Sequence, residues 1–542
     1  MGGVNVMDLS TWSLRDKIGQ IVMCGFDGTT PTEGIKQLIQ DYKLGGIIYF
    51  RRNVGPSSEV ARLSAELQAL SREVTDVPLW IAIDQEGGMV SRIDQDVALM
   101  PGNMAIGATG RLEYAYRTAR VSADELLQMG INMNLAPCLD VNNNPANPVI
   151  GVRSFGENPE KAAELGTAAI EGYQEAGVSA CAKHFPGHGD TTADSHHELP
   201  VVGHDHARLH AVELVPFRRA IEAGVDAIMT AHVMFPAYED SGVPSTLSAN
   251  IITGLLREEL GYNGVIVTDC LEMKAISETV GIGKGAVMSL QAGADLVLVS
   301  HRLDRQLEAF EAIYAAVASG ELTEERIDQS VRRVVGMKLR RGHAGSSVIG
   351  DDAAIGSETH LVVARETAEH SVTLVRNENQ VVPLQHDVPT FVIWPEVRTN
   401  TEVDEIIAQS VTIGSALRAY IGTVVEHVIG TEPTQEEIEQ VLQASEGYVQ
   451  LVVGTYNASF SAGQTALVNQ LLARDGVKVI VAALRNPYDL NQFPHVHGYL
   501  ACYENRPIMM EALAKVLAGE ARPHGKLPVT ITEQYVYGYG LV

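Results

Sequence analysis

Short apolar runs alternate with longer amphipathic stretches up to residue 340, and this alternation restricts the possible folds more than any other feature of the chain. Each run has the length and composition of a buried strand, and a polar or Gly/Pro-rich loop follows it. Repeated strand–helix units of this kind build parallel sheets. Eight successive units predict a (β/α)8 TIM barrel, because a doubly wound sheet would not naturally give eight units before a break. The predicted strands are 18–26, 45–50, 79–84, 131–139, 180–184, 227–233, 265–269 and 294–299.

A second, smaller α/β domain is predicted after the barrel. The segment GHAGSSVIGDDAAIGSE is small and polar without apolar periodicity, which is typical of a linker. A chain of 542 residues also exceeds what one hydrophobic core usually supports. We therefore predict a barrel domain at 1–342, a linker at 343–359 and a C-terminal α/β sandwich domain at 360–542. The predicted strands of the second domain are 390–394, 424–429, 448–453, 477–483 and 499–503, with helices at 435–444 and 462–474.

Charge and composition argue against several classes of partner. The formal net charge is −27 at pH 7, and no run of Lys and Arg offers the local basic patch that a nucleic acid would need. No segment approaches the roughly 20 apolar residues that span a bilayer, so no membrane partner is expected. The N-terminus lacks the pattern of a secretory signal, and the five widely spread cysteines resemble reduced core residues. These features predict a cytoplasmic protein.

Polar residues stand where the third to seventh predicted strands end. In chain order they are Asp84, Asp140, Lys183-His184, His232 and Asp269. In a (β/α)8 barrel the C-terminal ends of the strands meet at one mouth, and active sites are built there. We therefore expect these side chains to gather at a single site.

The loop after the fifth predicted strand, CAKHFPGHGDTTADSHHELP, is rich in histidine and glycine. Histidine titrates near neutral pH, and a carboxylate two residues away, as in Asp194-Ser195-His196, can orient the ring and stabilise its charged form. His196 is therefore a candidate proton shuttle. The loop could instead be an ordinary surface connector. A metal site is the other alternative, although the spacing matches no standard zinc motif. Its ligands would come from His184, His188, Asp190, Asp194, His196 and His197.

Asp269 closes an apolar run, so its carboxylate would project into the barrel mouth rather than into bulk water. A carboxylate there can be a nucleophile, or it can simply cap the next helix. Attack by Asp269 on an electrophilic centre, followed by release with activated water, would be a double displacement. Asp269 must then be ionised, while His196 gives a proton to the leaving group and later takes one from water.

Four motifs resemble the β-N-acetylglucosaminidase branch of the family 3 glycoside hydrolases in sequence, order and approximate spacing. They are IDQEGGMVSR, GVRSFG, KHFPGHGDTTADSHHELP and VTDCLEM, and the similarity extends over about residues 10–345. The resemblance implies a (β/α)8 barrel and a retaining mechanism. Many family members have a comparable C-terminal α/β domain, which supplies the acid/base in the β-glucosidase branch. Because His196 already lies in a barrel loop, we expect residues 360–542 to stabilise the fold, to dimerise or to shape the rim.

The resemblance also implies roles for the matching positions. Asp269 in TDCLEM corresponds to the catalytic nucleophile, His196 in DSHHELP to the general acid/base, and Asp194 to the partner that tunes the ring. A carboxylate can accept two vicinal hydroxyl protons, and Arg or Lys can donate to hydroxyl and acetamido oxygens. The positions that correspond to sugar-binding residues are Asp84, Arg92, Arg153, Lys183 and His184.

Two positions depart from the family pattern. Met89 stands where Arg is frequent, and Cys270 stands where Asp often follows the nucleophile. Neither position has a catalytic role in the family, so the departures affect local packing or loop anchoring without refuting the activity.

The sequence therefore predicts a retaining exo-β-N-acetylglucosaminidase that removes terminal β-GlcNAc from cell-wall (muropeptide) fragments or chitooligosaccharides. A sugar is the expected partner. Formation of a homodimer is one possible role of the C-terminal domain. Neither a metal nor another cofactor is expected. A neutral histidine base also tolerates an anionic acceptor, so a phosphorylase that releases GlcNAc 1-phosphate is one alternative. A non-catalytic sugar-binding protein is the alternative from another class.

Overall fold

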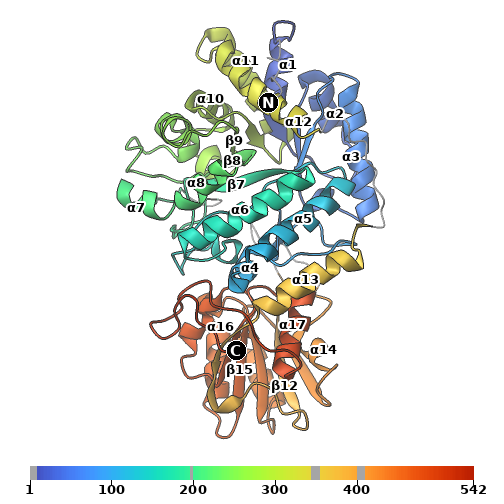
Figure 1. Ribbon diagram of the computed structural model, residues 1–542, viewed down its shortest axis with the longest axis vertical. Helices are drawn as coiled ribbons and strands as arrows, with labels where there is room; N and C mark the ends of the chain where they lie inside the picture. Colours follow the sequence, from blue (N-terminus) through green and yellow to red (C-terminus); the bar gives the residue numbers. More distant parts are fainter. Residues whose placement is uncertain (1–8, 196–198, 343–353, 399–408) are drawn as a thin grey trace.

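The first domain is an eight-stranded parallel sheet that curls into a barrel. The computed structural model describes residues 9–195, 199–342, 354–398 and 409–542, and Figure 1 shows the barrel above a smaller domain. The barrel strands are β1 (Val22–Cys24), β2 (Gly46–Tyr49), β3 (Trp80–Ile83), β6 (Met133–Asn134), β7 (Ser179–Phe185), β8 (Ala227–Thr230), β9 (Val265–Thr268) and β10 (Val297–Val299). Their order is β10-β1-β2-β3-β6-β7-β8-β9. A bridge between Val267 and Leu296 joins the two ends of this sheet, so the barrel is nearly closed.

Each of the eight predicted barrel strands overlaps an observed one, which confirms the predicted barrel. The first prediction begins too early, because Ser13 and Asp16 form a capping box that starts helix α1 (Leu14–Gln20) just before β1. The fourth prediction ends too late. Pro137 has no N–H to donate, and the regular part of β6 stops at Asn134.

Helices and short turns cover the outside of the barrel and connect its strands (Figure 1). The helices are α1, α2 (Glu33–Tyr42), α3 (Ser57–Arg72), α4 (Asn103–Thr109), α5 (Leu112–Gln128), α6 (Pro159–Ala176), α7 (His206–Ala211), α8 (Val215–Glu222), the π-helix η4 (Asn250–Glu259), α9 (Lys274–Ser277), α10 (Ile282–Ala292), α11 (Leu303–Ser319) and α12 (Glu324–Arg340). The 3₁₀ turns are η1 (Arg51–Asn53), η2 (Gly151–Arg153) and η3 (Ser245–Leu247). A small hairpin of β4 (Gln85–Gly87) and β5 (Val90–Ser91) follows β3.

The second domain is a six-stranded mixed sheet with helices packed on it. Its strands are β11 (Thr373–Asn377), β12 (Thr390–Glu396), β13 (Val424–Gly430), β14 (Gln450–Thr455), β15 (Lys478–Ala483) and β16 (Gly498–Ala501). Their order is β11-β16-β15-β14-β12-β13, and only the β11–β16 pair is antiparallel among the described residues. The helices and turns are α13 (Glu358–Ser371), η6 (Glu378–Gln380), α14 (Ile413–Leu417), α15 (Gln435–Ala444), η7 (Ala458–Phe460), α16 (Ala462–Leu472), η8 (Pro487–Gln492) and α17 (Pro507–Ala518).

The predicted second domain agrees with this architecture. All five predicted strands overlap observed ones, and the two predicted helices coincide with α15 and α16. The edge strand β11 was not predicted. The predicted linker 343–359 follows α12 and includes the first two residues of α13, and its residues 343–353 are outside the described residues.

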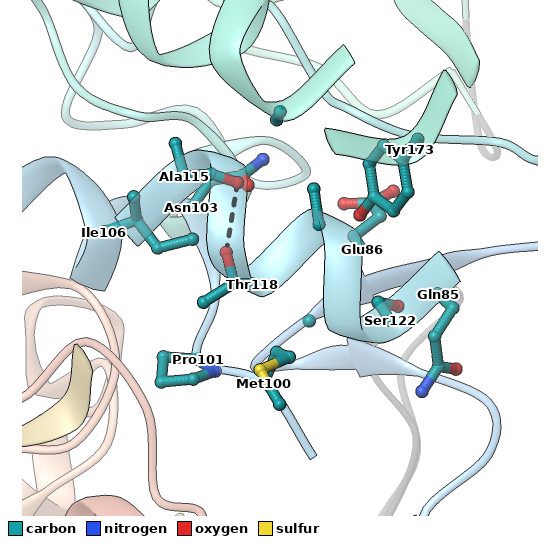
Figure 2. A pocket seen from close by; sticks show the side chains of 13 residues that line it. Gln85, Glu86, Met100, Pro101, Asn103, Ile106, Ala115, Thr118, Ser122 and Tyr173 are labelled. Carbon is teal, nitrogen blue, oxygen red and sulfur yellow. Dashed lines mark hydrogen bonds between the residues drawn. The ribbon is translucent and has the colours of Figure 1, made fainter. Parts of the chain in front are cut away.

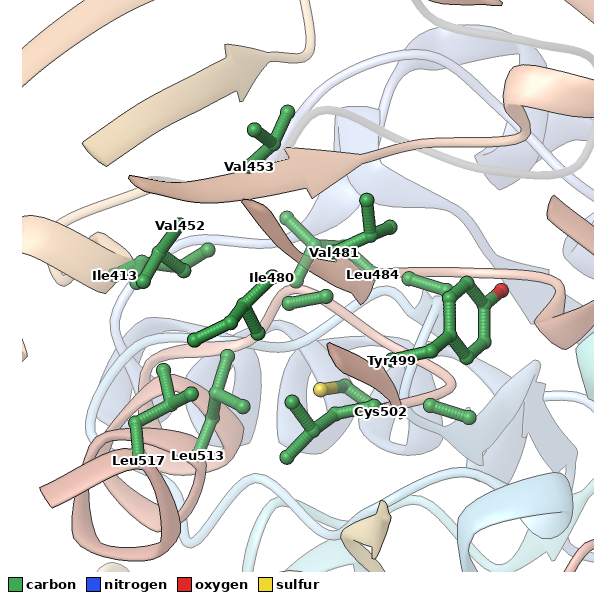
Figure 3. Close-up of a cluster of buried hydrophobic side chains, with 14 of the residues drawn as sticks. Ile413, Val452, Val453, Ile480, Val481, Leu484, Tyr499, Cys502, Leu513 and Leu517 are labelled. Atoms are coloured by element: carbon green, nitrogen blue, oxygen red, sulfur yellow. The ribbon is translucent and has the colours of Figure 1, made fainter. Parts of the chain in front are cut away.

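The two domains share buried apolar side chains. Figure 3 shows part of the hydrophobic cluster of the second domain, built on strands β14, β15 and β16. The same cluster continues into the barrel domain through Met89, Met104, Ala105, Ala108 and Val152. Helix α13 adds to the junction, because it packs against α4 and α5 on one side and α17 on the other. Over the part of the chain that the structure describes, no helix combines the length and the apolar character needed to cross a bilayer.

Candidate active site

Four charged side chains form a network at the mouth of the barrel. Asp84 follows β3 directly, and Lys183 lies near the end of β7. The ammonium Nζ of Lys183 is 2.6 Å from Asp84 Oδ1 and 2.7 Å from Glu86 Oε1. Arg153, at the end of η2, donates to Glu86 twice, from Nε to Oε2 at 3.0 Å and from Nη2 to Oε1 at 2.7 Å. The structure thus brings Asp84, Arg153 and Lys183 together around Glu86.

The charges in this network stabilise one another. Burial alone would raise the pKa of Glu86, but Arg153 and Lys183 hold it well below its ordinary value. Burial disfavours the charged form of Lys183, yet Asp84 and Glu86 raise the pKa of its ammonium group above the ordinary value. Glu86, Arg153 and Lys183 therefore stay ionised around neutral pH and act as fixed hydrogen-bonding groups.

Asp84 is the carboxylate of this network that a ligand can reach. Its side chain is 15% exposed, whereas that of Glu86 is only 2% exposed. Arg92 lies beside it, with Nη2 3.8 Å from Asp84 Oδ2. Asp84 and Arg92 stand at the two ends of the β4–β5 hairpin. A partly exposed carboxylate next to a guanidinium suits the binding of neighbouring hydroxyl groups.

His184 is held by Asp140 from the loop after β6. His184 Nδ1 lies 2.7 Å from Asp140 Oδ2, and the backbone N–H of His188 donates to Asp140 Oδ1 at 2.6 Å. Burial alone would raise the pKa of Asp140, but His184 and the N–H of His188 bring it to about 2. The ionised carboxylate accepts from Nδ1 of His184, which leaves Nε2 as the ring atom for another partner.

The loop after β7 is fixed by a second histidine, His188. Its Nδ1 is 2.8 Å from Thr191 Oγ1, and its Nε2 is 3.0 Å from Ser195 Oγ. Burial is the main reason why the pKa of His188 falls to about 4, so the ring is neutral at pH 7. These bonds hold Ser195, which is adjacent to the half-buried Asp194. The predicted acid/base His196 and its neighbour His197 lie among residues 196–198, outside the described residues.

Asp269 follows β9 directly and is half-buried. Its Oδ1 accepts the backbone N–H of Cys270 at 2.7 Å. His232, after β8, contacts the carbonyl oxygen of Cys270 through Nε2 at 2.9 Å and so anchors the backbone next to Asp269. Burial, with smaller contributions from the charges of Asp84 and Asp269, raises the pKa of the Cys181 thiol to about 12, although Lys183 acts to lower it. The charges of Asp269, Asp84 and Lys183 therefore all influence the same buried thiol inside the barrel.

Three functional neighbours carried no assigned role in the sequence prediction. Glu86 lies inside the DQEGG motif, and Asp140 and His232 stand at predicted strand ends. The signal that could have found Asp140 and His232 is their position at the barrel mouth. Glu86 gave no such signal, because only the fold shows that Arg153 and Lys183 converge on it.

The ligands predicted for a metal alternative do not converge within the described ranges. His184 is bound to Asp140, His188 to Thr191 and Ser195, and Asp190 Oδ2 to His204 Nε2 at 2.6 Å. Three groups do have metal-like proximity, namely Cys138 with Asp140 and His184, Asp190 with His204 and Glu213, and Cys270 with Glu272 and His301. In the first of these, Asp140 already accepts hydrogen bonds from two histidines, which leaves little of its carboxylate for an ion.

A small cavity lies behind the hairpin rather than at the mouth. Figure 2 shows Glu86 beside Tyr173 in its wall, with Met100 and Thr118 on the other sides. Its volume is about 10 Å³, which is enough for a single water molecule. It is too small to hold a sugar.

Known proteins resemble this chain over nearly its whole length. A solved family 3 β-N-acetylglucosaminidase from Paenibacillus sp. strain FPU-7 is 50% identical, covers 96% of this chain and 99% of its own, and superposes with a TM-score of 0.94. "Beta-hexosaminidase A" of Pseudoalteromonas piscicida is 33% identical over 93% of this chain and 92% of its own length. "Beta-N-acetylglucosaminidase/beta-glucosidase" of Cellulomonas fimi is 28% identical over 95% of this chain and 93% of its own length.

The two domains also match models of the same family separately. The glycosyl hydrolase family 3 N-terminal domain matches residues 13–337, and the family 3 C-terminal domain matches residues 372–537. The barrel with its charged mouth and the docked α/β domain are thus found in the same order as in that family, and the chain belongs to glycosyl hydrolase family 3.

Proposed function

We propose that this chain is a retaining exo-β-N-acetylglucosaminidase that removes terminal β-GlcNAc from cell-wall fragments or chitooligosaccharides. The observation that carries the proposal is the place of Asp269 at the end of β9, on the same barrel mouth as Asp84 and Lys183. The names of the similar proteins from Paenibacillus and Pseudoalteromonas support the choice of sugar.

The proposed binding of the sugar follows from the charged network. Asp84 would accept hydrogen bonds from two adjacent hydroxyls, while Arg92 and Lys183 donate to ring substituents. Nε and Nη2 of Arg153 donate to Glu86, so Arg153 would act mainly by keeping Glu86 ionised and Lys183 in place rather than by binding the sugar itself. His184, oriented by Asp140, would offer Nε2 to the sugar.

The proposed reaction is a double displacement. Asp269 attacks the anomeric carbon, while His196 protonates the leaving oxygen, and a glycosyl-enzyme forms on Asp269. His196 then takes a proton from water, which attacks the same carbon and releases GlcNAc. Asp194 would stabilise the charged ring. The bonds from His188 to Ser195 support these roles, because they hold the residue between Asp194 and His196.

Trapping of the glycosyl-enzyme tests the nucleophile. A 2-fluoro glycosyl substrate with an activated leaving group should label Asp269, because the fluorine slows both displacements whereas the good leaving group speeds only the first. Peptide mass spectrometry of the trapped protein locates the label, and Asp269→Asn should remain unlabelled. A label on another carboxylate, with Asp269 unmodified, would refute the mechanism.

Removal of the histidine tests the acid role. His196→Ala should lower the rate for substrates with poor leaving groups by about 10²–10⁴-fold, the usual contribution of general acid catalysis. The loss should be much smaller for activated aryl glycosides, which need little protonation. Rates for a series of aryl β-N-acetylglucosaminides measure this difference, and an equal loss across the series would count against His196.

Product analysis with and without inorganic phosphate separates the alternatives. Free GlcNAc in both samples supports hydrolysis. GlcNAc 1-phosphate in the sample with phosphate would replace hydrolysis with phosphorolysis, and failure to release any aryl group would favour a sugar-binding protein.

A further inference from the structure

The hairpin between Asp84 and Arg92 is held from outside the barrel. Its tip, Gly87-Gly88-Met89, turns through two glycines with positive φ, +94° at Gly87 and +55° at Gly88. Within the barrel domain, the tip is tied by the N–H of Gly88, which donates to the Met100 carbonyl at 2.8 Å.

The C-terminal domain hydrogen-bonds to this tip through the loop between β16 and α17. Arg506 donates from Nε to the Gly88 carbonyl at 2.7 Å and from Nη2 to the Met89 carbonyl at 3.1 Å. Glu504, in the same loop, accepts the N–H of Gly102 through Oε2 at 2.9 Å. Arg506 is 3% exposed and Glu504 is 1% exposed, so these bonds are shielded from water.

The fit around the tip is tight. A Cβ on Gly88 would collide with the Glu504 carboxylate and with the backbone of Gly102. The next residue, Met89, is 5% exposed and belongs to the hydrophobic cluster of the C-terminal domain. The tip therefore has little freedom to shift while the two domains stay docked.

We infer that Arg506 is a positioning residue for sugar binding, which holds the tip of the hairpin so that Asp84 and Arg92 keep their places at the barrel mouth. The inference rests on the proposed roles of Asp84 and Arg92. It gives the C-terminal domain a part in substrate recognition without a direct contact to the substrate. An arginine suits this task because its planar fork can serve two carbonyl oxygens at once, whereas a lysine is a single point of donation.

The test compares Arg506→Met and Arg506→Lys with the wild-type chain and with Arg117→Met. Arg117 is a matched control, because its guanidinium on α5 donates to Glu366 of α13 at 2.9 Å. Arg117→Met therefore removes a different contact across the same junction. The readouts are the inhibition constant of free GlcNAc, KM and kcat for an aryl β-N-acetylglucosaminide, and Tm. A displacement of about 1 Å can cost on the order of a hundredfold, so we expect Arg506→Met to raise the inhibition constant about tenfold or more.

The pattern of effects distinguishes positioning from mere stabilisation. Arg506→Lys should recover part of the affinity, and Arg117→Met should bind GlcNAc as the wild type does. Arg506→Met should also weaken binding much less in an Arg92→Lys background, because both substitutions act through the same hairpin. If Arg506→Met fails to fold, Arg506→Lys alone carries the comparison.

Two results would overturn the inference. One is wild-type affinity in a folded Arg506→Met variant, and the other is full additivity with Arg92→Lys. A wild-type chain that neither cleaves the glycoside nor binds GlcNAc would instead refute the proposed function, so the two failures are distinguishable.

Discussion

Two buried lysines show how the immediate surroundings of a side chain decide its charge. Lys183 at the barrel mouth meets two carboxylates, and they raise its pKa. Lys338 of α12 is equally buried, but within the described residues its ammonium group donates to neutral acceptors, Gln20 Oε1 at 2.9 Å and the Gly45 carbonyl at 2.6 Å. Both acceptors precede strands of the barrel, so Lys338 lies at the end opposite the active site. Burial lowers the pKa of Lys338 to about 7.

Lys338 should make stability depend on pH. With a folded pKa of about 7 against an ordinary value of 10.5, the unfolded state binds more protons between these values, so stability rises with pH in that window. The slope is at most about 1.4 kcal/mol per pH unit. Lys338→Met removes this contribution and fills a similar volume. Its Tm relative to the wild type should therefore be highest near pH 6 and fall towards pH 9.5, as calorimetry would show. Parallel profiles for the two proteins would contradict the low pKa.

At the scale of elements, the sequence predicted the strands better than their exact ends. Apolar runs bounded by turns identified all eight barrel strands, because a parallel strand is buried on both faces and reads as a continuous run. The helix–strand junction before β1 was missed because the buried end of α1 continues the same apolar run. The β4–β5 hairpin was missed because its strands are very short and its tip is glycine-rich.

The candidate site shows the same limit. The sequence indicated which residues stand at strand ends, and the structure places Asp84, Lys183 and Asp269 at one mouth. The sequence did not indicate that Glu86 and Arg153, 67 residues apart, form the buried pair that orders this mouth. Such pairs depend on how loops cross, which local patterns do not encode. The catalytic roles of Asp269, His196 and Asp194 stay predictions.

At the scale of the whole molecule, the junction between the domains contains a titratable group. Burial raises the pKa of Glu504 to about 7, although the N–H of Gly102 and the charge of Arg506 act to lower it. Because the ordinary value is 4.5, the folded protein binds more protons than the unfolded chain between pH 4.5 and 7. Stability that Glu504 contributes below this window is therefore lost as pH rises through it.

Glu504→Gln should remove this dependence. The amide oxygen can still accept the N–H of Gly102, and the side chain carries no charge at any pH. The Tm of the variant relative to the wild type should rise from pH 4.5 to pH 7 and level off above it. Scanning calorimetry across this range makes the comparison, and a constant difference would show that the interface does not titrate through Glu504.

The cross-domain grip on the hairpin also bears on how the protein is made. Arg506 comes 418 residues after Gly88, so the ribosome completes the entire barrel long before it adds the side chain that holds the tip. During that interval Met89 lacks the apolar side chains of the C-terminal domain, and the tip has its bond to Met100 without the two bonds from Arg506. A nascent or prematurely ended chain therefore lacks the contacts that hold the tip of the hairpin at the mouth. Synthesis of the last domain becomes the step that completes the first.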